Sequence, residues 1–563
     1  MITSSTKLLL ILIAIYFLGI FDHALWAPMD TVGAGMIWGM HAAGSWVVPL
    51  LNGQPYLEKP PLMHWTALGL ISVTGQLNEA MVRMPSALYG LGAVLITYYW
   101  GRREHSPRVG LCAAFLCSGS LLYLEYSRSV LTDAALVFVV VLSMQLFWWA
   151  YSRHRNRVLD FAPFILAASV AFFAKGLVGV AFIWAPIMAF LAYRRQWRWF
   201  FLLPMFYLPV FSALVGFWAY RVWLVGGEEY LRIIFVDNQL GRFFTFSDAN
   251  LPADPYFVHK EGLSYYLRDL PPRILPWVVL VPPAIYYWFR RSAPARTDFS
   301  VYLSFSLAIM LLILHASSAK VSEYALPVLP ILFYLTAVWL DTALKRWTSS
   351  FDKWAIVLAG LCAGLVALLP PLIIISLYLA PQSFLARYTG DIDVIRVAAP
   401  RAGAIYLLAS LILTVVIVGV VGYAGSQLRT DRRERLADAF PGTITLLLMI
   451  GLGLFTQVYD PQRSCKPVAD SLSQLMREGR QIALGTDAPH VTGCMTFYLQ
   501  TTLPVHDTAK AATDFLDSTP RATLLIEKDD LKKSTFATLP SRFSVTTIDY
   551  PGIAARNYAL ISN

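Results

Sequence analysis

Long runs of apolar residues, separated by short polar segments, fill the first 458 positions of the chain. A helix needs about 20 apolar residues to cross the hydrocarbon core of a bilayer, so these runs predict about thirteen membrane-spanning helices. We expect the spans near residues 8–26, 81–100, 108–123, 130–151, 160–175, 177–193, 199–224, 272–290, 298–315, 324–340, 354–379, 403–424 and 440–457. The first run lacks a small-residue cleavage site, so we expect it to remain as an uncleaved span with a cytoplasmic N-terminus.

The apolar run at 61–75 opens with two prolines and is shorter than the others. A crossing there would place the basic segment 102–108 outside, so we expect a membrane-surface or partly re-entrant helix instead. The odd number of spans leaves the loops 27–80 and 226–271 and the tail on the external side. The tail mixes helix-like and short β-rich stretches. We therefore expect a membrane domain over 1–458 and a periplasmic α/β domain over 459–563.

Composition and charge agree with a polytopic α-helical membrane protein. Hydrophobic residues make up 57% of the 563 residues and charged residues only 14%, and the mean hydropathy is +0.56. A soluble domain carries about 25% charged residues. The net charge of +10 is concentrated in short basic segments between apolar runs, such as 102–108, 194–198 and 429–435. This spacing is typical of cytoplasmic loops under the positive-inside rule, and it does not indicate a nucleic-acid partner.

Two of the five cysteines, Cys465 and Cys494, lie in the polar tail. In an oxidising periplasm they form a plausible disulfide, and two unpaired thiols are the alternative. No cysteine cluster has the spacing of a zinc site.

Ionisable residues gather at the external ends of the predicted spans, where their placement is informative because charges are costly at membrane depth. The basic members suit a phosphate that arrives from the bilayer. The acidic members suit sugar hydroxyls, an amino group, a metal or the role of a base. The set comprises Asp30, Tyr56, Glu58, Lys59, Arg128, Asp133, Lys175, Arg242, Lys320, Glu323 and Tyr324.

Several segments that carry these residues resemble one family in order along the chain. They are WAPMD at 26–30, GSWVVPLLNGQPYLEKPPLMHW at 44–65, VRMPSAL at 82–88, RSVLTDAAL at 128–136, AKG at 174–176, NQLGRF at 238–243 and AKVSEYALPVLP at 319–330. The chain is similar here to the GT-C polyprenyl-phosphate-sugar-dependent glycosyltransferases. That family includes the aminoarabinose transferase of lipid A and relatives of the protein O-mannosyltransferases. The resemblance covers about 8–340 and implies a GT-C fold.

The resemblance implies a donor sugar on an undecaprenyl-type phosphate, used on the periplasmic side of the bacterial inner membrane. Lys59 would contact the lipid phosphate, and Asp30 and Asp133 would act as catalytic residues facing the sugar or the acceptor. We also expect five further residues to bind substrate, namely Tyr56, Glu58, Arg128, Lys175 and Arg242, and the resemblance implies that Lys320 and Tyr324 line the donor cavity. One departure is that Met29 stands where the family commonly has an acidic residue, which leaves only Asp30 of an acidic pair.

Structural alternatives exist for each of these side chains. Asp30 and Asp133 can each cap a helix, and Lys59 can extend towards lipid headgroups. Lys175 and Arg242 can equally anchor the protein at headgroups. A divalent metal is possible, but no histidine spacing is diagnostic of one, so we assign no cofactor.

The sequence therefore predicts an inverting glycosyltransferase that moves one sugar from a polyprenyl phosphate to lipid A or to another lipid or glycan. A protein O-glycosyltransferase of the same fold is the nearest alternative. A flippase for lipid-linked sugars is an alternative of a different class, and it predicts charges along a mid-membrane path.

Overall fold

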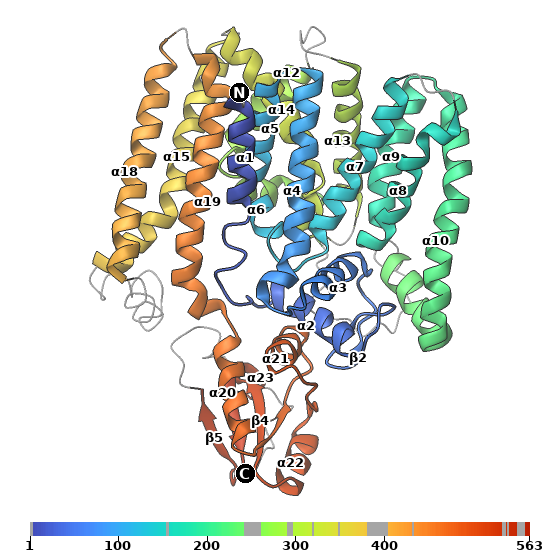
Figure 1. Ribbon diagram of the computed structural model, residues 1–563, viewed down its shortest axis with the longest axis vertical. Coiled ribbons are helices and arrows are strands. Elements are labelled where there is room, and N and C mark those ends of the chain that lie inside the picture. The colour runs from blue at the N-terminus through green and yellow to red at the C-terminus, as the bar shows by residue number, and fades with distance from the viewer. Residues whose placement is uncertain are drawn as a thin grey trace.

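The computed structural model describes residues 4–153, 157–240, 261–289, 297–317, 320–346, 349–379, 403–430, 433–531, 536, 540–548 and 558–563. The described residues form three layers along the long axis of the molecule (Figure 1). A bundle of long helices makes the first layer, and the helices α2 (Met29–Ala42) and α3 (Leu62–Thr74) lie beneath it. A small α/β unit built from the end of the chain makes the third layer.

Nine helices in the described part of the chain are long and apolar enough to cross a membrane. They confirm the corresponding predicted spans, although their ends differ by a few residues. α8 extends to membrane length when the preceding one-turn helix η1 (Val158–Phe161) is included. The nine are α4 (Glu79–Glu104), α7 (Asp133–Ser152), α8 (Ala162–Lys175), α10 (Trp197–Leu231), α13 (Asp298–Ala316), α14 (Val328–Lys345), α15 (Ser350–Leu379), α18 (Gly403–Gln427) and α19 (Leu436–Arg463).

The other predicted spans form helices that have at most 17 residues each in the described part of the chain. The helix α9 (Leu177–Tyr193) has the predicted bounds but only 17 residues. The span predicted at 8–26 is wrong in length, because α1 (Ser4–Tyr16) ends before Gly19, which has a positive φ of 84°. A glycine in that conformation ends a helix readily. The total of thirteen spans therefore stays a prediction.

Two predicted spans are broken into pieces. The span 108–123 divides into α5 (Pro107–Ser118) and α6 (Leu121–Tyr126). The span 272–290 was wrong, because α11 (Tyr265–Arg273), the one-turn helix η3 (Val278–Leu280) and α12 (Val281–Phe289) replace it. Pro276 lies between α11 and η3, and proline lacks the amide hydrogen that a continuous helix needs.

The basic segments meet at one end of the bundle, where the N-terminus also lies (Figure 1). Arg108 Nη1 lies 3.3 Å from Glu434 Oε2, which connects the segments 102–108 and 429–435. Arg194 Nη2 lies 2.9 Å from Asp298 Oδ2 near the same end. We call this the basic end of the bundle. The layer of α2 and α3 lies at the opposite end.

The loop predicted at 27–80 folds into two short helices and a hairpin. The strands β1 (Leu50–Leu51) and β2 (Gln54–Pro55) pair antiparallel, and Asn52 and Gly53 have positive φ between them. Two consecutive residues of that conformation make the tight turn of a two-residue hairpin. The helix α3 confirms the short helix predicted at 61–75, and it lies across the end of the bundle (Figure 1).

The C-terminal unit contains a four-stranded sheet in the order β3 (Gln481–Leu484), β4 (Ala522–Glu527), β6 (Tyr558–Ser562) and β5 (Ser544–Thr547). β3 and β4 are parallel, and the other two pairings are antiparallel. The helices α20 (Lys466–Arg477), α21 (Pro489–Leu499) and α22 (Ala509–Ser518) pack on the sheet. A disulfide joins Cys465 to Cys494, the pair that the sequence predicted.

The C-terminal unit docks on α2 through close backbone contact. A Cβ atom added to Gly35 of α2 would lie 2.5 Å from Gly493 Cα, and one added to Gly493 of α21 would lie 2.4 Å from the Thr31 carbonyl oxygen. These glycines let two helices approach more closely than larger residues allow. Asn52 strengthens the contact, since its side chain both accepts from the Leu503 amide and donates to the Leu503 carbonyl at 2.9 Å. The C-terminal unit therefore fixes the position of α2.

Candidate active site

An ion pair between two helix ends forms the centre of the candidate site. Asp133 is the first residue of α7 and Lys175 is the last residue of α8. Lys175 Nζ donates a hydrogen bond to Asp133 Oδ1. The same ammonium group lies 4.3 Å from the centre of the Tyr324 ring, which is within the range of a cation–π contact. The structure thus brings together three residues that the sequence placed far apart.

The pair of Asp133 and Lys175 keeps unused hydrogen-bonding capacity, although the Asp133 side chain is only 5% exposed. Oδ2 of Asp133 accepts no hydrogen bond from a described residue, and the Lys175 side chain is 13% exposed. Asp133 makes no helix-cap hydrogen bond, so the capping role that the sequence left open is absent. We call Asp133 and Lys175 the open ion pair. A cation with a neighbouring carboxylate acceptor suits a phosphate and a sugar hydroxyl bound side by side.

Glu323 adds a second carboxyl group beside the open ion pair. It lies in the one-turn helix η4 (Ser322–Ala325), directly before Tyr324. Burial raises the pKa of Glu323 above its usual value, and the nearby Asp133 raises it further. A carboxyl group with a raised pKa holds its proton at higher pH and can donate a hydrogen bond. The site therefore places a second carboxyl group, with a raised pKa, beside Asp133.

The loop that carries Lys59 approaches the open ion pair through the segment η2 (Arg232–Leu240). Asn238 Nδ2 donates to the Leu57 carbonyl at 3.3 Å, and the next residue, Gln239, accepts from the Leu177 amide at 2.8 Å. Leu177 follows Lys175 by two positions. The pair Asn238–Gln239 therefore connects the loop 56–59 with the turn between α8 and α9.

Lys59 and Glu58 are positioned together on this loop. Lys59 Nζ lies 4.0 Å from Glu58 Oε2, and both side chains are 24% exposed. Behind them, His64 of α3 is buried, and burial followed by the charge of Lys59 lowers the pKa of His64 to about 4. At neutral pH Lys59 is therefore the cation of this loop, and His64 is uncharged. The position of Lys59 agrees with the phosphate role that the resemblance implies.

Asp30 differs from its predicted role, because the structure places it in a closed ion pair with Arg83 of α4. Arg83 donates to Asp30 Oδ2 from Nε at 3.1 Å and from Nη2 at 2.6 Å. The Val130 amide donates to Oδ1 at 2.9 Å. Arg83 also donates to the carbonyls of His23 and Ala24. Asp30 is 3% exposed and fully bonded, so the geometry argues against a base at this position.

The closed ion pair positions the segment that leads into Asp133. Asp30 holds the amide of Val130, three residues before Asp133. Ser86 Oγ donates to the Leu131 carbonyl at 3.1 Å. The first turn of α7 is thereby fixed by side chains from α2 and α4. Asp30 is a positioning residue in this geometry.

The remaining predicted residues fall outside the open ion pair. Lys320 is buried and donates to the carbonyls of Glu261 and Ser317, which leaves little of it for a substrate. Arg128 stacks 5.5 Å from the centre of the Tyr16 ring, on the side of α1. Burial lowers the pKa of Arg128 from its usual value. The hydroxyl of Tyr56 is buried on the loop of Lys59. Arg242 lies outside the described residues.

Parts of the sequence are similar to known proteins. Residues 58–223 match the family described as dolichyl-phosphate-mannose-protein mannosyltransferase. An undecaprenyl phosphate-alpha-4-amino-4-deoxy-L-arabinose arabinosyl transferase of Pseudomonas aeruginosa is 30% identical over 331 residues, 57% of each chain. The transferase of that name from Edwardsiella ictaluri is 25% identical over 82% of this chain and 78% of its own length. An uncharacterized protein of Aquifex aeolicus is 26% identical over 60% of this chain.

Solved structures share the fold. The crystal structure of ArnT from Cupriavidus metallidurans bound to undecaprenyl phosphate superposes with a TM-score of 0.71 at 17% identity, covering 99% of this chain and 97% of that one. The apo oligosaccharyltransferase of Archaeoglobus fulgidus gives a TM-score of 0.51 at 11% identity, covering 97% and 70%. The chain therefore shares the fold of these membrane proteins, and its sequence matches the family model over part of its length. It spans 65% of the length of the Aquifex protein and 57% of that of the Pseudomonas protein.

The segment that matches the family model includes both members of the open ion pair. Lys59, Asp133 and Lys175 lie within 58–223, whereas Asp30 precedes that segment and Tyr324 follows it. Among the residues that the structure describes, no group of three or more histidine, cysteine or acidic side chains is arranged to hold a metal ion.

Three residues that organise the site in the structure have no predicted role in the sequence. Arg83 carried a signal, since it is a charged residue at the start of an otherwise apolar run. Asn238 and Gln239 stood in a segment that resembles the family, but without an assigned function. Their roles depend on contacts across 181 and 62 positions of sequence, which no local pattern indicates.

Proposed function

We propose that this protein transfers a sugar from a polyprenyl-phosphate donor to an acceptor at the end of the bundle that carries α2 and α3. The open ion pair is the observation that carries the proposal, because it places an ammonium group and a carboxylate together beside the loop of Lys59. The names of the Pseudomonas and Edwardsiella relatives support a donor of the undecaprenyl-phosphate class and an acceptor of the lipid A class. The chain then acts as a lipid-modifying transferase.

The reaction is a single displacement at the anomeric carbon of the donor sugar. An acceptor oxygen forms the new bond to that carbon, while the bond from the carbon to the phosphate oxygen breaks with inversion. The electron pair of the broken bond stays on the polyprenyl phosphate, which leaves as an anion. Lys175 and Lys59 stabilise the charge that develops on this phosphate. If the acceptor is itself a phosphate, it arrives ionised and needs no base.

Asp133 orients the reactants in this proposal. Its carboxylate holds Lys175 through Oδ1 and presents Oδ2 to a sugar hydroxyl. If the acceptor is a hydroxyl, Asp133 replaces Asp30 as the base, because its second oxygen is not bonded to a described residue. Asp30 and Arg83 then act indirectly by fixing the start of α7.

The sidedness of the site follows from the charge distribution. The basic end of the bundle carries the segments 102–108 and 429–435, and positively charged loops stay in the cytoplasm. The site is at the opposite end, which we assign to the periplasmic face of a bacterial inner membrane. The C-terminal unit with its disulfide then lies in an oxidising compartment.

The test is sugar transfer by the full-length protein in proteoliposomes that contain a labelled undecaprenyl-phosphate sugar and lipid A. Lys175→Met is expected to lower kcat/KM by about 10²–10³-fold, the usual loss when one stabiliser of transition-state charge is removed. Lys345→Met is the matched control, since Lys345 also pairs with an aspartate, Asp341, but at the basic end. Normal transfer by Lys175→Met would contradict the site assignment.

The family description favours one second candidate, a protein O-glycosyltransferase. Mass spectrometry of lipid A and of secreted proteins, with and without the gene, separates the two. A mass increment on lipid A supports the first proposal, and one on a protein supports the second. Movement of the labelled lipid across the bilayer without sugar transfer would indicate a flippase.

A further inference from the structure

A cavity of about 550 Å³ lies near the basic end of the bundle, where its lining includes Leu344 in the last turn of α14 and Arg429 after the end of α18. It is bounded by η3, α14, α15, α18 and α19, and shares no residue with the open or the closed ion pair. Its walls are apolar and include Leu280, Leu340, Ile356, Leu361, Val421 and Phe440. An apolar cavity of this size suits hydrocarbon chains better than water.

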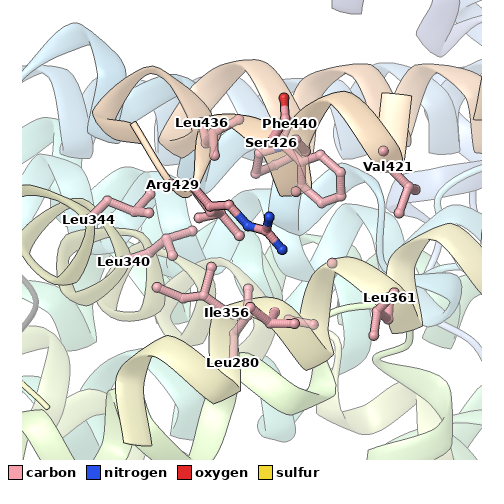
Figure 2. Close-up of a pocket in the computed structure, with 18 of the residues that line it drawn as sticks. Leu280, Leu340, Leu344, Ile356, Leu361, Val421, Ser426, Arg429, Leu436 and Phe440 are labelled. Atoms are coloured by element: carbon pink, nitrogen blue, oxygen red, sulfur yellow. The ribbon is translucent and has the colours of Figure 1, made fainter. Parts of the chain in front are cut away.

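Arg429 is the charged side chain that lines this cavity. It follows the end of α18 and extends between the apolar side chains of the walls, as Figure 2 shows. Its guanidinium forms no ion pair with a residue in the described part of the chain. The Arg429 side chain is exposed at one end of the cavity, where an anionic headgroup can pair with it. This end of the cavity is therefore complementary to a negatively charged group.

The wall formed by α18 is open towards the surrounding bilayer. Gly422 and Gly425 line the cavity and are exposed, and a Cβ atom added to either would meet no heavy atom within 4 Å. Large apolar side chains on the neighbouring surface, such as Val418 and Leu358, are also exposed, as expected where lipid contacts a helix. The exposed glycines leave the α18 side of the cavity accessible to an acyl chain from the bilayer.

We propose that this cavity binds an anionic glycerophospholipid, with acyl chains among the apolar walls and the phosphate at Arg429. The basic segment at the mouth adds favourable charge, since Arg433 lies against the end of α14 through a hydrogen bond to the Leu344 carbonyl. Basic sites between helices on the cytoplasmic side of a membrane protein favour anionic headgroups. The ligand differs in class and location from the donor of the transfer reaction. The site would thus be a lipid site in the leaflet opposite to the active site.

Native mass spectrometry of the full-length protein tests this proposal, with phosphatidylglycerol and phosphatidylcholine of identical acyl chains as probes. The wild type is expected to retain phosphatidylglycerol about tenfold better, because phosphatidylglycerol carries a net negative charge, whereas the choline cation of phosphatidylcholine offsets the charge of its phosphate. Arg429→Gln is expected to abolish this preference. Arg102→Gln, which changes an exposed arginine at the same end, is the control and is expected to retain it.

A second variant acts on the apolar part of the cavity. Gly425→Leu places a side chain into the space and is expected to reduce retention of both lipids at least about threefold, a modest steric effect. Gly419→Leu is its control, because Gly419 lies on the same helix, is also free of contacts within 4 Å and does not line the cavity. The comparison of Gly425→Leu with Gly419→Leu tests lipid binding in the cavity even if Arg429→Gln fails to fold.

Three results of the retention measurements would each overturn the proposal. They are equal retention of both lipids by the wild type, an unchanged preference in Arg429→Gln, and equal retention by Gly425→Leu and Gly419→Leu. Displacement of phosphatidylglycerol by inorganic phosphate alone would also overturn it, because the site would then recognise a free anion and not a lipid.

Discussion

The closed and the open ion pair are built from similar parts but differ in how many of their hydrogen bonds are satisfied. In each, an aspartate in the first turn of a helix pairs with a cation from another helix. The closed pair satisfies every oxygen of Asp30 and every nitrogen of Arg83 with described partners. The open pair leaves Asp133 Oδ2 without a described partner and part of Lys175 exposed. The number of unmet hydrogen bonds, more than burial, distinguishes a site from a support.

Arg83→Met is expected to have the largest effect. It leaves the Asp30 carboxylate buried without its guanidinium, which costs about 3–5 kcal/mol of the free energy of unfolding. Thermal unfolding of the detergent-purified protein measures this loss. A variant with wild-type stability but no transfer activity would instead show that the closed pair takes part in the reaction. The contrast between the two pairs would then not hold.

Cys494→Ser is expected to have the next largest effect. The disulfide closes a loop of 29 positions, and its removal costs about 3 kcal/mol in the C-terminal unit. Because α21 packs against α2, the loss should reach the closed pair before the open one. Limited proteolysis of the C-terminal unit and the transfer assay measure the two effects. Cys362→Ser, which changes a free cysteine within α15, is the control. Equal proteolysis of both variants would contradict the prediction.

Asp133→Asn and Asp30→Asn separate the two pairs directly. Asp133→Asn is expected to lower kcat/KM by about 10–100-fold with a small change in stability, as for loss of one reacting-group contact. Asp30→Asn is expected to lower stability by about 1–3 kcal/mol and to reduce activity only as far as the folded fraction falls. Transfer kinetics corrected for the folded fraction give the answer. The reverse pattern would restore the catalytic role predicted for Asp30.

Glu323→Gln is expected to have the smallest effect, and to change a pH profile. The folded-state pKa of Glu323 is raised by burial and then by Asp133. The folded protein therefore binds this proton more tightly than the unfolded chain. Its contribution to stability is present below the unfolded pKa and is lost as pH rises through the raised folded value. Glutamine removes that loss, so the unfolding temperature of the variant should decline less with pH. Identical profiles would show that Glu323 is not protonated in the fold.

Sequence patterns predicted most of the helices well because the patterns are local. The run at 177–193 matches α9, and the short run at 61–75 matches α3. The span predicted at 272–290 was wrong because Pro276 and its neighbours break the helix inside an apolar run. Apolar character alone does not distinguish one long helix from two short ones joined at a proline.

The candidate site was predicted as a set of residues but not as a geometry. Asp30, Asp133 and Lys175 were recognised because charges near membrane spans are costly and therefore informative. The sequence could not assign their partners. Asp30 meets Arg83 across 53 positions, and Lys175 meets Asp133 across 42 positions. Such pairings depend on how α2, α4, α7 and α8 pack.

The sequence by itself determined that the chain is a helical membrane protein, which end of the bundle is basic, and which charged residues are candidates for the site. Hydrophobicity and loop charge act along the chain, so one dimension is enough to reveal them. Only the tertiary structure showed that Arg83 and the Val130 amide satisfy both oxygens of Asp30, and that Asp133 keeps one oxygen without a partner among the described residues. How many acceptor sites of a carboxylate stay unused depends on every donor that packing brings within hydrogen-bond distance. Those donors come from distant parts of the chain.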